Sequence, residues 1–156
     1  MNSRRKAHRI PFSFDHYDDV IGFVVSQAAF QLARTLAKAI ADAGFDITPR
    51  EFAVINRLHQ HGELNQSELA EITYKDKPAV TRMLDRLIVR GMVQKVPDSA
   101  DRRAFKVSLT DKGEHVRDQI VPLCVQMLEQ SCKSIRREDL LTTVATLKKL
   151  TAQIQH

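Results

Sequence analysis

The residues best suited to recognise an anionic partner lie on one face of a short amphipathic segment, residues 76–90. If this segment is helical, its apolar positions form a buried face consisting of Val80, Met83, Leu84, Leu87 and Ile88. The opposite face presents Lys77, Pro78, Thr81, Arg82, Asp85 and Arg86. A guanidinium can bridge two acceptors on a guanine edge, and a threonine can donate to a phosphate or contact a thymine methyl. The pattern therefore has the chemistry of a helix that reads a DNA major groove.

A second basic cluster lies in the polar stretch 97–103, which contains Asp101, Arg102 and Arg103. The flanking segments 92–96 and 105–109 are short, partly alternating and rich in β-branched or aromatic residues, which is typical of strands. The stretch between them is too long for a two-residue turn, so we expect a hairpin with an extended basic tip. Arginines at such a tip suit a narrow minor groove, whose negative potential attracts guanidinium groups.

Helix start and stop signals surround both clusters. Thr48 and Glu51 form a predicted capping box with Pro49 at the first helical position, and Asn65 with Glu68 repeats the signature. Asp76 is expected to begin the basic helix, and Gly91 to end it. Two short capped helices followed by a hairpin predict a winged helix-turn-helix, in which the second helix enters the major groove.

Long helices are predicted on both sides of this lobe. Apolar residues recur at helical spacing over about 15–43, again after a helix start at Thr110 and Asp111, and again after a break near 131–136. These apolar faces are broader than one small lobe can cover, so we expect a homodimer. The predicted fold is mainly α with a small β-wing. Residues 12–44 and 111–156 would form a helical dimerisation region, and residues 45–110 the DNA-binding lobe.

Composition is that of an ordinary globular protein with a basic balance. Of 156 residues, 43% are hydrophobic and 28% are charged, and the formal net charge is +5. A positive balance suits an anionic partner, either nucleic acid or a membrane surface. No apolar run approaches the roughly 18 residues of a membrane span, and no secretory signal is evident, so we expect a cytoplasmic protein that does not bind membranes.

From Asn65 to Gly113 the sequence resembles the MarR family of bacterial regulators. The resemblance rests on the run from Asp76 to Leu87, on Gly91-Met92-Val93, on Asp101 and Arg103 in the wing, and on Leu109-Thr110-Asp111-Lys112-Gly113. It implies a homodimeric transcriptional regulator, usually a repressor, that binds a pseudo-palindromic operator in double-stranded DNA. It also implies release from DNA by a small lipophilic or phenolic effector bound between lobe and platform.

The resemblance also implies roles for individual residues. Lys77, Pro78, Thr81, Arg82 and Arg86 would lie in the major groove. Arg102 and Arg103 would lie on the wing, with Arg103 in the minor groove and oriented by Asp101 and by Asp76. For the effector, the candidates are Arg9, His16 and Tyr17; the alternative is that His16 and Tyr17 only support the dimer interface.

Other chemistry is weakly represented. Cys124 and Cys132 are eight residues apart, about 12 Å along a helix, and cannot form a disulfide within it. They are interpreted as packing residues, with regulation by cysteine oxidation as an alternative. His59, His61 and Glu63 leave metal sensing open as another alternative, although a surface role is favoured. No catalytic constellation or cofactor motif stands out, so we expect no enzyme and no cofactor. A regulator controlled by its abundance alone, and a lobe that binds protein instead of DNA, are the remaining alternatives.

Overall fold

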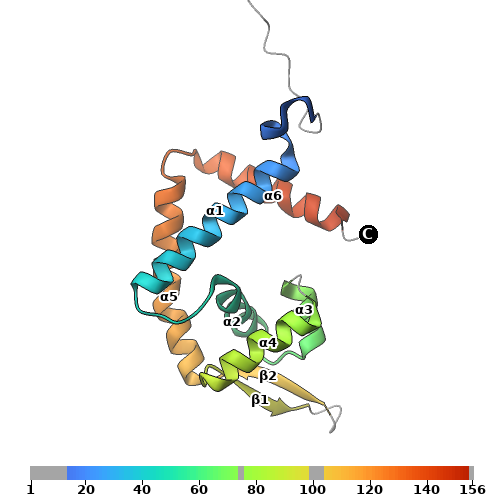
Figure 1. The fold of residues 1–156 in the computed structure, drawn as a ribbon, viewed down its shortest axis with the longest axis vertical. Helices are drawn as coiled ribbons and strands as arrows, with labels where there is room; N and C mark the ends of the chain where they lie inside the picture. Colours follow the sequence, from blue (N-terminus) through green and yellow to red (C-terminus); the bar gives the residue numbers. More distant parts are fainter. Residues whose placement is uncertain (1–13, 74–75, 99–103, 155–156) are drawn as a thin grey trace, which may run out of the picture.

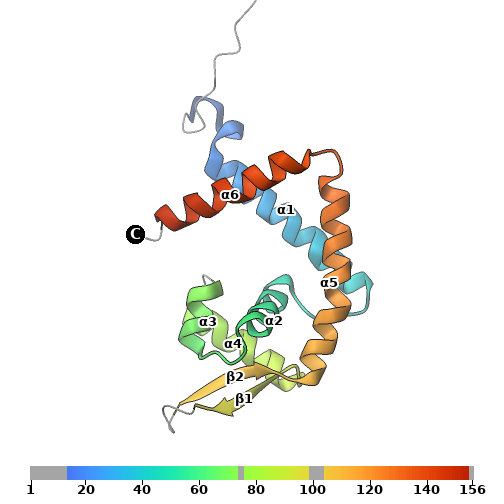
Figure 2. The same ribbon diagram turned by 180° about the vertical axis from the view of Figure 1, so that it is seen from behind.

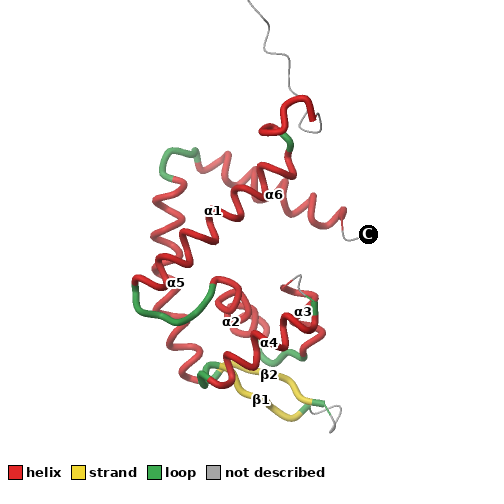
Figure 3. Tube along the Cα trace, viewed as in Figure 1, coloured by secondary structure: helices red, strands yellow, loops and turns green. Residues whose placement is uncertain are grey.

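The computed structural model describes residues 14–73, 76–98 and 104–154, with only the backbone of Asp15 and His16. Figures 1 and 3 show a lobe of short helices and a hairpin, joined by a long helix to a second group of helices. The order of elements is η1 (Phe14–Asp19), α1 (Ile21–Asp42), α2 (Pro49–His61), α3 (Gln66–Thr73), α4 (Lys77–Val89), β1 (Val93–Pro97), β2 (Phe105–Leu109), α5 (Asp111–Cys132) and α6 (Arg137–Ile154). The described fold is mainly α with a small β-wing, as the sequence predicts.

The helices of the lobe begin at the predicted caps. The hydroxyl of Thr48 accepts from the Glu51 backbone N–H at 3.2 Å, and the Glu51 carboxylate accepts from the Thr48 N–H at 2.9 Å. Before α3, Asn65 Oδ1 accepts from two backbone N–H groups, and Glu68 Oε2 accepts from the Asn65 N–H at 2.7 Å. Each pair satisfies N–H groups that the first turn of a helix leaves without partners. Local sequence therefore determines where α2 and α3 start.

The hairpin pairs Val93 with Leu109 and Pro97 with Phe105 in antiparallel register. The second strand has the predicted bounds, whereas the first begins one residue later than the predicted 92–96. The shift has a local cause, because the Met92 N–H donates to the Leu87 carbonyl at 2.9 Å and closes the end of α4. Gly91 has φ 70°, a left-handed conformation that glycine adopts without strain. An isolated bridge between Leu64 and Val107 ties the entry of α3 to the hairpin.

The hydrophobic core lies mainly in the lobe. Its largest fully buried side chains come from α2, α3 and α4, and α1 and α5 each add one isoleucine: Ile55, Leu58, Leu69, Leu84, Leu87, Ile40 and Ile120. Four of the five predicted core positions of α4 are buried, namely Val80, Met83, Leu84 and Leu87, and the fifth, Ile88, is half-buried. The buried stripe of α4 leaves its opposite face directed outward.

The first long helix is shorter than predicted. In place of one helix over about 15–43, a 3₁₀ helix ends at Asp19, and α1 starts at Ile21. Val20 separates them with an extended backbone (φ −72°, ψ 124°) and a buried side chain. Helical periodicity continues through Val20 in the sequence, so the apolar spacing alone gave no sign of this break.

A large apolar surface is exposed on the helices outside the lobe. Figure 2 shows that α6 begins at the end of α5 that is farther from the hairpin, and that α6 overlaps α1 in this view. The exposed large side chains there belong to α1, α5 and α6: Val24, Phe30, Leu32, Val125, Leu128, Leu141, Val144 and Ile154. Helix α6 has no buried residue in this single chain. Exposed apolar surfaces of this kind are typical of protein–protein contacts.

Candidate nucleic-acid interface

Helix α4 presents the predicted row of polar and basic side chains on its outer face. Its N-cap Asp76 accepts from the Ala79 N–H at 2.7 Å, and Pro78 occupies the first turn, where its missing N–H costs nothing. Lys77, Pro78, Arg82 and Arg86 are exposed, whereas Thr81 is half-buried. The Thr81 hydroxyl donates to the Lys77 carbonyl at 2.9 Å, so its methyl group and its oxygen lone pairs remain available to a partner.

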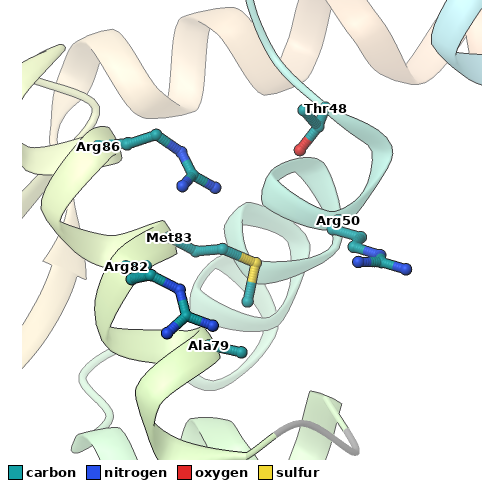
Figure 4. A pocket seen from close by; sticks show the side chains of 6 residues that line it. All are labelled: Thr48, Arg50, Ala79, Arg82, Met83 and Arg86. Carbon is teal, nitrogen blue, oxygen red and sulfur yellow. The ribbon is translucent and has the colours of Figure 1, made fainter.

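A hollow of about 410 Å³ lies between α4 and the start of α2. Figure 4 shows Arg82 and Arg86 extending from α4 and Arg50 from α2 around it, with Met83 at its floor. Thr48 and Ala79 complete the lining. Three guanidinium groups on one surface make this face of the lobe strongly basic. The sequence predicted Arg82 and Arg86 here but missed Arg50, because a helix start gives no information about which neighbouring helix it approaches.

A buried carboxylate supports this basic face from below. The Glu51 side chain is 0% exposed, and its Oε1 accepts from Arg86 Nε at 2.7 Å. Arg90 Nη1 lies 3.4 Å from Glu51 Oε2, and it also donates to the Asp46 carbonyl at 2.7 Å. Burial by itself raises the pKa of Glu51. The hydrogen bonds from Arg86 and Thr48 and the charge of Arg90 outweigh that effect and hold the pKa below its ordinary value.

The wing residues Asp101, Arg102 and Arg103 lie outside the described residues. Next to them, the ammonium of Lys95 lies 4.4 Å from the centre of the half-exposed Phe105 ring, across the two strands. Gln94 and Ser108 are partners in the register of the two strands, and Gln94 Nε2 donates to Ser108 Oγ at 3.3 Å. The base of the hairpin is therefore held by cross-strand contacts as well as by its backbone ladder.

The start of α5 is hydrogen-bonded to the segment that joins α4 to the hairpin. The Thr110 hydroxyl accepts from the Gly113 N–H at 3.1 Å as a helix cap and donates to the Gly91 carbonyl at 2.6 Å. Lys112 Nζ donates to the Arg90 carbonyl at 2.7 Å. These bonds connect the chain between α4 and β1 to the start of α5, so the outer face of α4 has a fixed place relative to the long helix.

Comparison with known proteins identifies the class to which this lobe belongs. The model of the MarR family matches residues 47–105. The multiple antibiotic resistance protein MarR of Escherichia coli is 33% identical over 106 residues, which cover 67% of this chain and 74% of that protein. The chain belongs to the MarR family. It is a DNA-binding transcriptional regulator with a winged helix-turn-helix.

Further relatives agree in sequence and in fold. The transcriptional repressor NicR of Pseudomonas putida is 31% identical over 104 residues, 67% of this chain and 66% of that protein. A crystal structure of a mutant E. coli MarR in complex with operator DNA superimposes with a TM-score of 0.77 and 27% identity. That match covers 87% of this chain and 98% of the solved one. The MarR fold thus extends from the lobe to the long helices.

Of the predicted effector residues, Tyr17 alone has a described side chain in this MarR-family protein. Arg9 and the side chain of His16 lie outside the described residues. Tyr17 packs against the rings of Phe14 and Phe23, at 6.1 Å and 4.6 Å between centroids. A different hollow of about 330 Å³ lies under α1 and is mostly apolar, with two arginines: Ala33, Pro49, Arg50, Ala53, Arg57, Ile72, Thr73 and Met83 line it.

The cysteines and histidines were the candidates for redox or metal sensing. Cys124 and Cys132 are both free and half-buried, and burial raises the pKa of the Cys124 thiol. His59 Nδ1 lies 2.8 Å from Glu114 Oε2 and so connects α2 to α5. Among residues 14–73, 76–98 and 104–154, no three histidine, cysteine or acidic side chains are arranged to hold a metal ion. Within the same ranges, no helix combines the length and apolar character that a membrane crossing requires.

Proposed function

We propose that the protein is a repressor that binds a pseudo-palindromic operator in double-stranded DNA as a homodimer. One observation carries the proposal: a capped helix presents exposed Lys77, Arg82 and Arg86 on the face opposite its buried stripe. The mutant E. coli MarR that this chain resembles was crystallised with operator DNA. No catalytic or cofactor-dependent role is proposed, and the protein would act in the cytoplasm.

The proposed contacts divide between two grooves. Arg82 and Arg86 read base edges in the major groove, and Lys77, Pro78 and Thr81 approach the phosphates or thymine methyls beside them. Arg103 enters the minor groove from the wing, with Asp101 orienting it and Arg102 near the phosphates. Arg50 is added to this set, since it shares the basic hollow with Arg82.

The exposed apolar surface divides the chain into a proposed dimerisation region and a proposed DNA-binding lobe. Residues 12–44 and 111–156 form the dimerisation region, in which α1, α5 and α6 pack against a second copy. Residues 45–110 form the DNA-binding lobe. A two-fold dimer then places two α4 helices on successive turns of one face of the duplex.

A small aromatic or lipophilic acid is the proposed effector. The hollow under α1 combines apolar walls with the guanidinium groups of Arg50 and Arg57, which can pair with a carboxylate. It lies between α1 and the lobe, where a ligand would change their relative position. Arg9, His16 and Tyr17 remain proposed contributors from the N-terminal segment.

The decisive experiment compares two arginines that carry the same charge. A duplex that the protein selects from a random library and a scrambled duplex are titrated by fluorescence anisotropy at several salt concentrations. Arg82→Ala should cost about 1–3 kcal/mol on the selected duplex and reduce the preference over the scrambled one. The control is Arg137→Ala, at the start of α6, which removes the same charge far from α4 (Figure 1). Equal losses in both variants would refute the assignment of α4 as the reading helix.

A further inference from the structure

Glu51 accepts more hydrogen bonds than a helix cap requires. Of the bonds that the Glu51 side chain accepts, the capping box needs only the one from the Thr48 N–H. The amide oxygen of a glutamine could accept this bond as well. The carboxylate additionally accepts from the Thr48 hydroxyl at 2.9 Å, from Arg86 Nε at 2.7 Å and, at 3.4 Å, from Arg90 Nη1. The negative charge therefore serves Arg86 of α4 and Arg90 at its C-terminal cap rather than the start of α2.

A fully buried carboxylate is an inefficient way to stabilise a lobe. A buried ion pair gains little net stability, because removal of the charge from water offsets most of the attraction. An apolar side chain at this position would not incur that desolvation penalty. The advantage of the charge must then lie in where it places the guanidinium groups.

The bond to Glu51 fixes one arginine and leaves its neighbour unrestrained. Arg86 is held through Nε, yet its side chain is 49% exposed, and its two terminal amino groups have no partner within the described residues. Two parallel N–H groups on a fixed guanidinium suit the paired acceptors of a guanine edge. Arg82, one turn earlier, has no ion pair or side-chain hydrogen bond in the same part of the chain, so it must lose more side-chain freedom when it binds.

We propose that Glu51 is a positioning residue that determines base specificity by holding Arg86 ready for a guanine. The inference rests on the proposed function, in which α4 lies in the major groove. It also predicts two effects of opposite sign. Neutralising Glu51 releases Arg86 and lowers discrimination between duplexes. It also adds one net positive charge next to the DNA, which strengthens binding to any sequence.

Glu51→Gln tests the proposal, because glutamine keeps the cap hydrogen bond and the side-chain volume. The ratio of the dissociation constants for scrambled and selected duplexes should fall about three- to tenfold, part of what a bidentate arginine–guanine pair contributes. Affinity for the scrambled duplex should rise. A purely structural role would instead weaken binding to both duplexes together. An unchanged ratio in a folded Glu51→Gln dimer would overturn the proposal.

A double-mutant cycle shows whether Glu51 acts through Arg86. In the Arg86→Ala background, Glu51→Gln should leave the ratio unchanged, whereas in the Arg82→Ala background it should lower the ratio as it does in the natural sequence. Equal losses in both backgrounds would overturn the proposal. If Arg86→Ala itself leaves binding to both duplexes unchanged, the proposed contact of Arg86 with DNA is wrong, which is a separate failure.

A measurement on the unsubstituted protein covers the case in which Glu51→Gln does not fold. In protein labelled with ¹⁵N-arginine, the Nε–H of Arg86, assigned by its loss in Arg86→Lys, should exchange with water more slowly than that of Arg82. Its relaxation should also be that of the rigid backbone. An Arg86 signal as mobile as that of Arg82 would refute the idea that Glu51 holds it.

Discussion

Gly113 occupies a position where even one methyl group cannot fit. It is the third residue of α5 and is buried against the end of the hairpin. A Cβ placed there would lie 2.1 Å from the Met92 carbonyl oxygen and 3.3 Å from Leu109 Cδ2. The Met92 carbonyl is backbone and accepts from the Thr110 N–H at 3.1 Å, so it cannot move without loss of that bond. Gly113→Ala should therefore separate α5 from the lobe.

The magnitude follows from three terms. Overpacking against backbone costs about 3 kcal/mol, at the upper end of the usual range. The lost hydrogen bond adds about 1 kcal/mol, and the better helix propensity of alanine returns about 1 kcal/mol. The net loss of about 3 kcal/mol should lower the melting temperature by about 6–12 °C for a chain of this size.

The assay is urea unfolding followed by circular dichroism at one fixed protomer concentration, because dimer stability depends on that concentration. Gly22→Ala in α1 is the matched control, since within one chain a Cβ there meets nothing within 4 Å. It should change the unfolding free energy by less than about 1 kcal/mol, in the stabilising direction. If the two variants are equally stable, the contact between Met92 and α5 does not constrain the lobe.

Three further outcomes are expected. Leu141 on α6 is 60% exposed in one chain, so Leu141→Asp should abolish the dimer without loss of core packing; sedimentation that still shows a full dimer would exclude α6 from the interface. The lowered pKa of Glu51 contributes stability that is present above its ordinary value of 4.5 and is lost as pH falls through the folded-state value. The urea midpoint should therefore drop in acid, and a midpoint that falls equally in Glu51→Gln would assign the drop to other groups. Footprinting should show an inverted repeat with half-sites about 10 bp apart, and protection of direct repeats would contradict a two-fold dimer.

Local signals predicted the lobe well because its helices begin with side chains that bond their own first turns. Thr48 and Asn65 each bond a backbone N–H three residues ahead, and Asp76 does the same for α4. These interactions need no tertiary information, so the starts of α2, α3 and α4 are legible in the sequence. The break at Val20 has no such signal. Its extended backbone has no side-chain cap, and an apolar residue at helical spacing looks the same on either side of it.

The candidate site was predicted in part, for a related reason. The outward face of α4 follows from periodicity, which is a local property, and so Arg82 and Arg86 could be identified. Arg50 and Glu51 belong to the site through contacts between helices, and Arg86 is 35 residues from Glu51 in the chain. The capping box already explained Glu51 as a local helix cap. The sequence therefore gave no reason to expect its contact with Arg86. No spacing rule distinguishes a carboxylate that caps a helix from one that also holds an arginine on the next helix.

The long helices show the same limit at the level of the whole molecule. Their apolar periodicity predicts burial, yet α6 buries no side chain in one chain, and Phe30 of α1 is 61% exposed. Apolar periodicity indicates which face of a helix is buried in the functional oligomer. It does not indicate which surface covers that face. Because α1, α5 and α6 all expose apolar side chains, a second copy can cover all three at once, and an isologous contact needs no other surface. The uncovered apolar face of the single chain therefore supports the proposed dimer interface.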